Sequence, residues 1–172
     1  GEAQLVYQFA LPPLILDALR TGSSNRLARW AADLRLPSDR VTFFNLTASH
    51  DGIGLLPARG LLPEASVQAL VEQTLAHGGR VSYRADPDGG ESVYELNISY
   101  FDALSDPGGG EPLETQAARF LLSQAIMLSL AGVPGIYFHS LFGSRSWTAG
   151  VAQTGRNRSI NREKLDRAAL EQ

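Results

Sequence analysis

The 172-residue chain contains no cysteine, which excludes both a disulfide framework and a thiolate nucleophile. Lysine and arginine number 15 against 18 acidic residues, so the net charge is −3 and lacks the basic excess of a nucleic-acid-binding protein. No apolar run approaches the ~20 residues that a membrane-spanning helix needs. The remaining composition, 44% hydrophobic and 19% charged, is that of a globular domain. We therefore expect a cytoplasmic protein that binds neither nucleic acid nor membrane.

Apolar and amphipathic segments alternate along the chain. Short apolar runs predict strands at 5–10, 40–46 and 135–139, and helical periodicity predicts helices at 12–20, 26–34, 63–78, 114–130 and 161–170. The segment 78–92 is too rich in glycine and aspartate for a core element. Strands separated by helices indicate β/α units around a parallel sheet. Three strands cannot close a barrel alone, but they are compatible with three neighbouring strands of a larger barrel.

Both ends of the sequence fall within segments that are patterned as secondary structure. An apolar segment starts at Leu5 without a preceding turn, and Gln172 ends an expected helix. We therefore expect residues 1–172 to be a fragment of a longer chain.

The segment Ala48 to Gly54 reads Ala-Ser-His-Asp-Gly-Ile-Gly and follows the clearest strand. Functional groups of parallel β/α barrels lie at the carboxyl ends of the strands, which is where His50 and Asp51 fall. Gly52 and Gly54 would let the backbone turn tightly beneath a ligand. Taken alone, the tripeptide His50-Asp51-Gly52 is more typical of a capped turn than of a binding site.

Three segments in series resemble the sucrose phosphorylase-like glycoside phosphorylases of the α-amylase superfamily. They are Val6–Leu14, Ala48–Gly54, and Gly132–Phe138 followed by Asn157–Arg162. The resemblance places them at strands 6, 7 and 8 of a (β/α)8 TIM barrel. It implies an α/β fold and makes residues 1–172 the C-terminal portion of a catalytic barrel. The nucleophilic aspartate and the acid/base glutamate, which the family takes from strands 4 and 5, would lie outside this chain.

The same resemblance gives roles to individual residues. Asp51 would be the third carboxylate, a transition-state stabiliser that binds glucose hydroxyls, and His50 would donate to a hydroxyl of the same sugar. Arg158 matches an arginine that reaches the glucose subsite and pairs with its carboxylates. The alternative for Arg158 is a solvated side chain in a basic stretch with Arg156 and Arg162.

Tyr94 and Glu95 match a Tyr-Gln pair that, in sucrose phosphorylases, lies on a mobile loop at the acceptor and phosphate side. The glutamate is a departure, since a carboxylate repels phosphate and alters what binds beside the glucose. We therefore expect Tyr94 and Glu95 to contact substrate and expect a native substrate other than sucrose. The alternative is that Glu95 is only a surface charge.

The resemblance implies part of a retaining α-glucosyl phosphorylase, a glycosyltransferase of the disaccharide phosphorylase type. A small α-glucoside of the glucosylglycerate, glucosylglycerol or sucrose type would react with inorganic phosphate to give α-glucose 1-phosphate. No cofactor is needed, and the three histidines lack zinc-ligand spacing, so no metal is expected. The alternatives are a hydrolase or transglucosidase of the same superfamily and a non-catalytic sugar-binding fragment. We expect the fragment alone to be inactive, and the sequence leaves the aglycone and the oligomeric state open.

Overall fold

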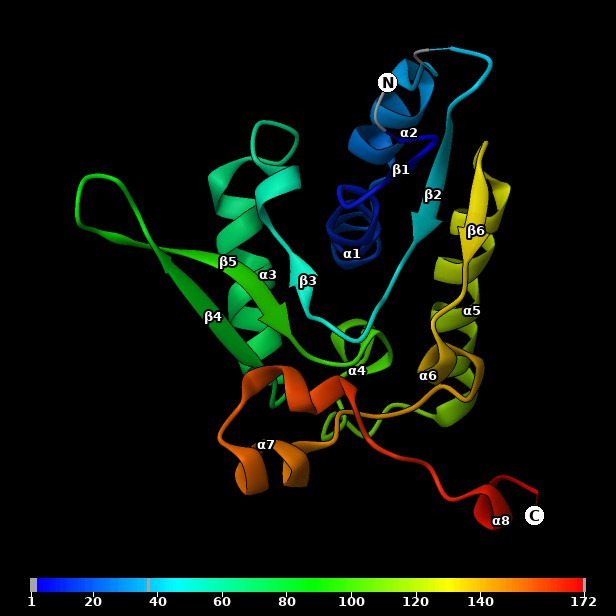
Figure 1. Ribbon diagram of the computed structural model, residues 1–172. Helices are drawn as coiled ribbons and strands as arrows, with labels where there is room; N and C mark the ends of the chain where they lie inside the picture. Colours follow the sequence, from blue (N-terminus) through cyan, green and yellow to red (C-terminus); the bar gives the residue numbers. More distant parts are fainter. Residues whose placement is uncertain (1–2, 37, 172) are drawn as a thin grey trace.

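A three-stranded parallel sheet forms one part of the computed structural model, which describes residues 3–36 and 38–171 (Figure 1). Its strands are β1 (Leu5–Tyr7), β2 (Thr42–Leu46) and β6 (Val133–Gly135), in the order β1-β2-β6. Both pairings are parallel, with Phe44 of β2 opposite Tyr7 of β1 and Val133 of β6. The predicted parallel sheet is confirmed, although β6 begins and ends earlier than expected.

Ten helical segments connect and cover the strands within the described residues. They are α1 (Leu11–Thr21), α2 (Asn25–Asp33), the 3₁₀ turn η1 (Leu56–Ala58), α3 (Glu64–Ala76), α4 (Tyr100–Leu104), α5 (Leu113–Ser129), α6 (Phe138–Leu141), α7 (Thr148–Thr154), the 3₁₀ helix η2 (Asn157–Asn161) and α8 (Arg167–Leu170). Prolines in the first turn of α1 occupy positions where a missing N–H costs little, and Gly22 ends the helix with a φ of 67°. The four long helices predicted before residue 131 correspond to α1, α2, α3 and α5.

The prediction of one helix over 161–170 is wrong. The structure has η2 up to Asn161 and the short α8 after it. The cause is tertiary contact: Asn161 Nδ2 donates to the carbonyl of Asp51 at 3.0 Å, and Arg162 Nε donates to the carbonyl of His50 at 2.9 Å. These bonds hold the start of the segment against the loop that follows β2.

A second, antiparallel sheet includes much of 78–92, where no strand was predicted, although these strand residues stay exposed or half-buried as expected of a segment outside the core. Its strands are β3 (Ile53–Gly54), β4 (Arg80–Ala85) and β5 (Glu91–Asn97), in the order β3-β5-β4. The β4–β5 hairpin projects from the body of the molecule in Figure 1. Its tip turns at Gly89, which has a φ of 85°. The polar residues belong to the tip, whereas the carboxyl end of β5 is buried.

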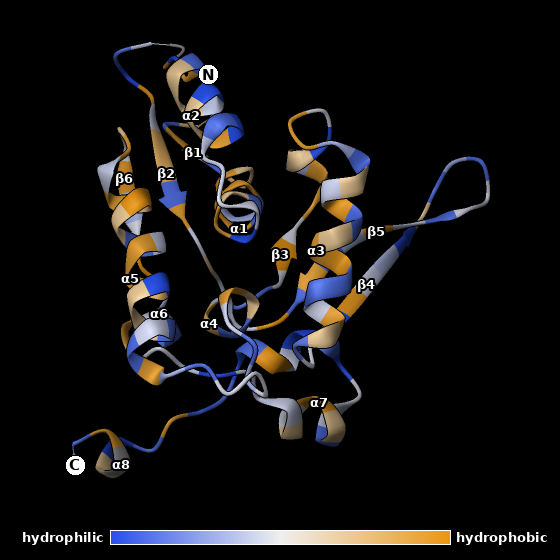
Figure 2. Cartoon of the chain, turned by 180° about the vertical axis from the view of Figure 1, so that it is seen from behind, coloured by the Kyte–Doolittle hydropathy of each residue, from blue (hydrophilic) through white to orange (hydrophobic). Residues whose placement is uncertain are grey.

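The hydrophobic core surrounds α1 and is formed with side chains of α3, α4, α5 and the second sheet. Its fully buried side chains include Leu11, Leu14, Ile15, Leu55, Leu96 and Ile98. Figure 2 shows hydrophobic colour on β3 and hydrophilic colour at the hairpin tip. Among the described residues, no helix is long and apolar enough to cross a membrane.

The parallel sheet leaves apolar surface uncovered. Leu5, Val6 and Tyr7 of β1 are 46%, 41% and 54% exposed, and Val133 of β6 is 45% exposed. Both strands are edges, since neither has a second partner strand within residues 3–36 and 38–171. Solvated apolar edges of this kind are unusual in a finished sheet.

Candidate functional site

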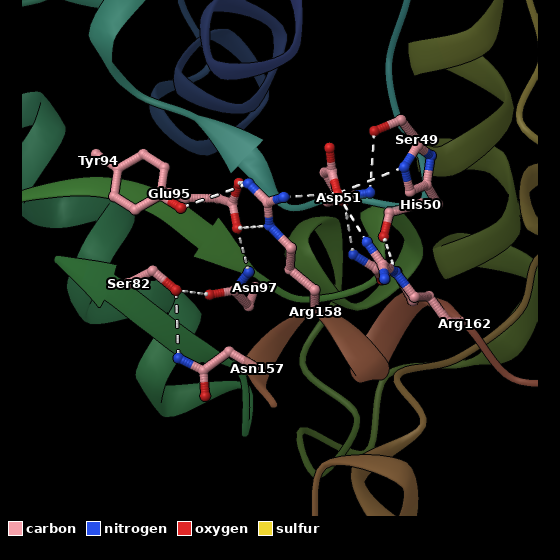
Figure 3. A network of polar contacts seen from close by, with 11 residues as sticks. Ser49, His50, Asp51, Ser82, Tyr94, Glu95, Asn97, Asn157, Arg158 and Arg162 are labelled. Carbon is pink, nitrogen blue, oxygen red and sulfur yellow. Dashed lines mark hydrogen bonds and ion pairs between the residues drawn. The ribbon is translucent and has the colours of Figure 1, made fainter. Parts of the chain in front are cut away.

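Asp51 lies in the loop that joins the carboxyl end of β2 to β3 (Figure 3). Its Oδ1 accepts hydrogen bonds from Nη2 of Arg162 at 2.9 Å and lies 3.0 Å from Nη1 of Arg158. His50 Nε2 is 3.6 Å from the same oxygen. Within the described part of the chain, the hydrogen bond that the Asp51 carboxylate accepts goes to Oδ1. The carboxylate is therefore anchored through one oxygen, and its side chain keeps 34% of its surface exposed.

The backbone of this loop is pinned as well. Besides the two bonds from Asn161 and Arg162, the amide of Asp51 donates to Oγ of Ser49 at 3.1 Å. An anchored backbone restricts the rotamers through which the Asp51 carboxylate can move, which favours a preorganised site.

Arg158 connects Asp51 to the hairpin. Its Nε donates to Oε1 of Glu95 at 3.0 Å and its Nη2 to Oε2 at 2.7 Å, a bidentate pair. Nη2 also donates to the hydroxyl of Tyr94 at 3.4 Å. The hydrogen bonds with Glu95 raise the pKa of Arg158, with the charge of Asp51 adding to the effect. The guanidinium therefore stays protonated between two carboxylates.

Glu95 is buried, with 4% of its surface exposed, so the alternative of a surface charge is excluded. It lies on strand β5 and not within a loop. Asn97 Nδ2 donates to Glu95 Oε1 at 2.6 Å, and Ser82 Oγ donates to Asn97 Oδ1 at 2.6 Å. Asn157 Nδ2 in turn donates to Ser82 Oγ at 3.3 Å, so residues of η2 close the network.

Gly52 has a different role from the one the sequence indicated. A Cβ at this position would lie 2.5 Å from the carbonyl of Leu96, 2.6 Å from Cγ of Glu95 and 2.7 Å from Nδ2 of Asn97. Gly52 is required because β5 approaches the Asp51 loop closely, and not because of a tight turn beneath a ligand. Gly54 has only one neighbour at 3.9 Å, so its lack of a Cβ gives no such close approach.

The structure gathers all five residues singled out from the sequence, namely His50, Asp51, Tyr94, Glu95 and Arg158, into one network (Figure 3). It adds six side chains to which the sequence gave no role, namely Ser49, Ser82, Asn97, Asn157, Asn161 and Arg162. Arg162 belongs to the Asn157–Arg162 segment on which the resemblance drew, which is the one signal that pointed to it.

A pocket of about 730 Å³ opens beside Arg158 and Arg162. Its lining is polar and its charged members are all arginines: Ser82, Thr154, Arg156, Asn157, Arg158 and Arg162 line it together with Gly155 and Ser159. An arginine-lined pocket without a carboxylate favours an anionic ligand. No group of three His, Cys, Asp or Glu side chains that could hold a metal ion occurs in the ranges 3–36 and 38–171.

Comparison with known proteins gives close relatives, although no protein-family profile matches the chain. A glucosylglycerate phosphorylase from Allomeiothermus silvanus is 54% identical over 171 residues, which cover 99% of this chain and 31% of that protein. The glucosylglycerate phosphorylase of Escherichia coli is 50% identical over 95% of this chain and 29% of its own length. The sucrose phosphorylase of Bifidobacterium adolescentis is 29% identical, and the match covers 100% of this chain and 34% of that protein. The chain thus spans about a third of the length of these relatives.

Among solved structures, the chain is similar to the crystal structure of sucrose 6F-phosphate phosphorylase from Thermoanaerobacter thermosaccharolyticum, with a TM-score of 0.81 and 24% identity. The match covers 97% of this chain and 32% of that one. This likeness concerns the fold, and it confirms the expected partial (β/α)8 barrel. The chain is homologous, over nearly its full length, to a part of the sucrose phosphorylase-like glycoside phosphorylases.

Proposed function

We propose that the chain is the C-terminal portion of the catalytic barrel of a longer cytoplasmic protein, a retaining α-glucosyl phosphorylase that we call the full enzyme. The observation that carries this proposal is the state of Asp51, with Oδ1 held by two arginines and 34% of the side chain still exposed. The uncovered edges of β1 and β6 support the existence of further barrel strands. So does the fraction of each relative that the chain spans.

In this proposal Asp51 acts on the sugar without attacking it. A carboxylate whose position is fixed accepts hydrogen bonds from two glucose hydroxyls and stabilises the positive charge that develops on the ring. His50, with its side chain 65% exposed, donates to a hydroxyl of the same glucose. The C1–O bond to the aglycone breaks as an aspartate of the full enzyme bonds to C1, and the acid/base glutamate of the full enzyme donates a proton to the departing oxygen. A phosphate oxygen then displaces that aspartate. Each displacement inverts C1, so the configuration is retained overall and α-glucose 1-phosphate forms.

Glucosylglycerate is the first candidate for the glucoside. Relatives that carry this name are 50% to 54% identical to the chain, whereas the sucrose phosphorylase from Bifidobacterium is 29% identical. Both glycerate and phosphate are anions, which matches the pocket lined by Arg156, Arg158 and Arg162. Tyr94 and Glu95 contact Arg158, which lines this pocket, although they do not line it themselves.

The full enzyme would be incubated with phosphate and each of four glucosides: glucosylglycerate, glucosylglycerol, sucrose and sucrose 6F-phosphate. Formation of α-glucose 1-phosphate, fastest with glucosylglycerate, is the expected result. Release of free glucose at a rate independent of phosphate would instead identify a hydrolase. Transfer of glucose to another sugar would identify a transglucosidase. Binding of glucosides without turnover would leave a sugar-binding protein.

A further inference from the structure

We infer that Glu95 acts as a positioning residue whose effect on the reaction passes through Arg158 to Asp51, and that Asn97 and Ser82 hold Glu95 in place. These three residues, Ser82, Asn97 and Glu95, are called the positioning relay below. The kinetic test of this inference rests on the proposed function, in which Asp51 contacts the sugar and these residues fix its position.

The first step concerns the hydrogen-bonding capacity of Glu95. Its Oε1 accepts from Arg158 Nε and from Asn97 Nδ2, and its Oε2 accepts from Arg158 Nη2. An ionised carboxylate offers about four acceptor positions, so three are already filled from within the protein. Its side chain is 5% exposed, and Glu95 does not line the arginine pocket. Little of the carboxylate is left for direct contact with an acceptor.

The second step concerns the direction of the Arg158 guanidinium. Glu95 occupies the edge formed by Nε and Nη2, which leaves Nη1 as the remaining nitrogen. The guanidinium is planar, so fixing one edge fixes where the third nitrogen points. Nη1 lies 3.0 Å from Oδ1 of Asp51. Glu95 therefore fixes the position of the Nη1 atom of Arg158 that contacts Asp51.

The third step concerns what holds Glu95. Asn97 is fully buried, and its carbonyl oxygen is occupied by Ser82 Oγ at 2.6 Å, which turns its Nδ2 toward Glu95. Asn157 reaches Ser82 from η2, next in sequence to Arg158. The hairpin and η2 therefore meet through two adjacent residues (Figure 3). Asn157 contacts Ser82, which supports Glu95 through Asn97, and Arg158 is the residue whose orientation Glu95 fixes.

The test is a double-mutant cycle in the full enzyme, with kcat and KM measured for glucosylglycerate and phosphate. Glu95→Gln keeps the shape of the side chain but exchanges a charged bidentate acceptor for a single neutral oxygen. We expect kcat to fall about tenfold, with the KM of phosphate nearly unchanged. In an Arg158→Lys background the same substitution should change kcat by a factor near one, because the forked contact is already lost. Asn97→Ala and the milder Ser82→Ala should lower kcat about threefold.

Glu91→Gln is the matched control, since Glu91 lies on the same strand but is exposed. It should leave kcat and KM unchanged. An equal effect of Glu95→Gln in both backgrounds would overturn the inference, and so would an effect confined to the KM of phosphate. The latter result would identify Glu95 as a direct acceptor contact.

A crystal structure of the Glu95→Gln variant separates this inference from the proposed function. We expect Nη1 of Arg158 to move out of hydrogen-bond distance of Asp51, and an unchanged contact would contradict the positioning relay. If the wild-type full enzyme formed no α-glucose 1-phosphate from any glucoside, the proposed function would fail. The crystal structures would still decide whether Glu95 positions Arg158.

Discussion

Nη1 of Arg158 lies 3.0 Å from Oδ1 of Asp51, although the two residues are more than a hundred positions apart in the sequence. The contact joins η2 to the loop after β2. The same guanidinium holds Glu95, so one side chain ties the Asp51 carboxylate to the hairpin.

Replacing Arg158 by lysine should lower kcat by about tenfold without unfolding the protein. Lysine keeps the charge, but as a point charge it cannot hold Glu95 with two hydrogen bonds and reach Asp51 at once. Steady-state kinetics with glucosylglycerate measures the effect, with the melting temperature as a check on folding. Wild-type kcat in this variant would show that the fork geometry has no part in the reaction.

Asp51→Asn should reduce kcat/KM by roughly 10²- to 10³-fold, because the neutral amide cannot stabilise positive charge on the sugar ring. Phosphorolysis of glucosylglycerate is the measurement. Asp88→Asn at the hairpin tip, where the side chain accepts from Gly90 N, is the matched control and should be neutral. Comparable losses in both variants would argue against a special role for Asp51.

Arg156→Ala should raise the KM of glucosylglycerate about fivefold while leaving the KM of glucosylglycerol unchanged at saturating phosphate. Arg156 is exposed in the arginine pocket, and a single exposed charge contributes up to about 1 kcal/mol. The difference between the charged and the uncharged glucoside should shrink at high salt. An equal rise for both glucosides would show that the pocket does not recognise the aglycone charge.

Gly52→Ala should destabilise the protein by about 1–3 kcal/mol, because the new methyl group would collide with the backbone of β5. Thermal or urea unfolding measures this cost. Gly54→Ala adds a methyl group that meets one atom at 3.9 Å, so this control should unfold like the wild type. Matching stabilities for the two variants would mean that β5 and the Asp51 loop move apart easily.

Tyr100 should make stability fall at alkaline pH. Burial raises its pKa well above 10.0, and its hydroxyl donates to the carbonyl of Pro12 at 3.0 Å. The unfolded chain loses this proton more readily than the folded one. The contribution is therefore complete below pH 10 and is lost as the pH rises through the folded-state pKa.

Tyr100→Phe should cost about 1 kcal/mol at neutral pH and show a shallower decline above pH 10, as followed by unfolding between pH 8 and 11. Tyr83→Phe is the control, because Tyr83 is 54% exposed. A decline in Tyr100→Phe as steep as in the wild type would assign the alkaline loss to other groups.

Much of the parallel sheet could be predicted from the sequence, because continuous apolar runs such as 40–46 identify strands covered on both faces. The hairpin could not, since the glycines and aspartates of its tip outweighed the strand residues on either side. The available signal was Asp88-Gly89, a dipeptide typical of a hairpin turn, flanked by Tyr83 and Val93.

The members of the site were predictable to a similar degree. His50, Asp51 and Arg158 stand in segments with a family resemblance, and the structure brings them together. The burial of Glu95 depends on the packing of β5 against the Asp51 loop and η2, which are far from it in sequence. Asn97 and Ser82 carry no motif, and only the pairing of β4 with β5 makes them neighbours.

The closeness of Gly52 to β5 has a consequence for protein engineering. Exchanging residues 80–97 for the matching segment of a relative is one way to test the proposed role of Tyr94 and Glu95. In this protein the exchange would also remove the partner of Arg158 and the surface against which Gly52 packs. The hairpin depends on contacts with η2 and with the loop after β2, so a successful chimera would have to exchange these segments together with it.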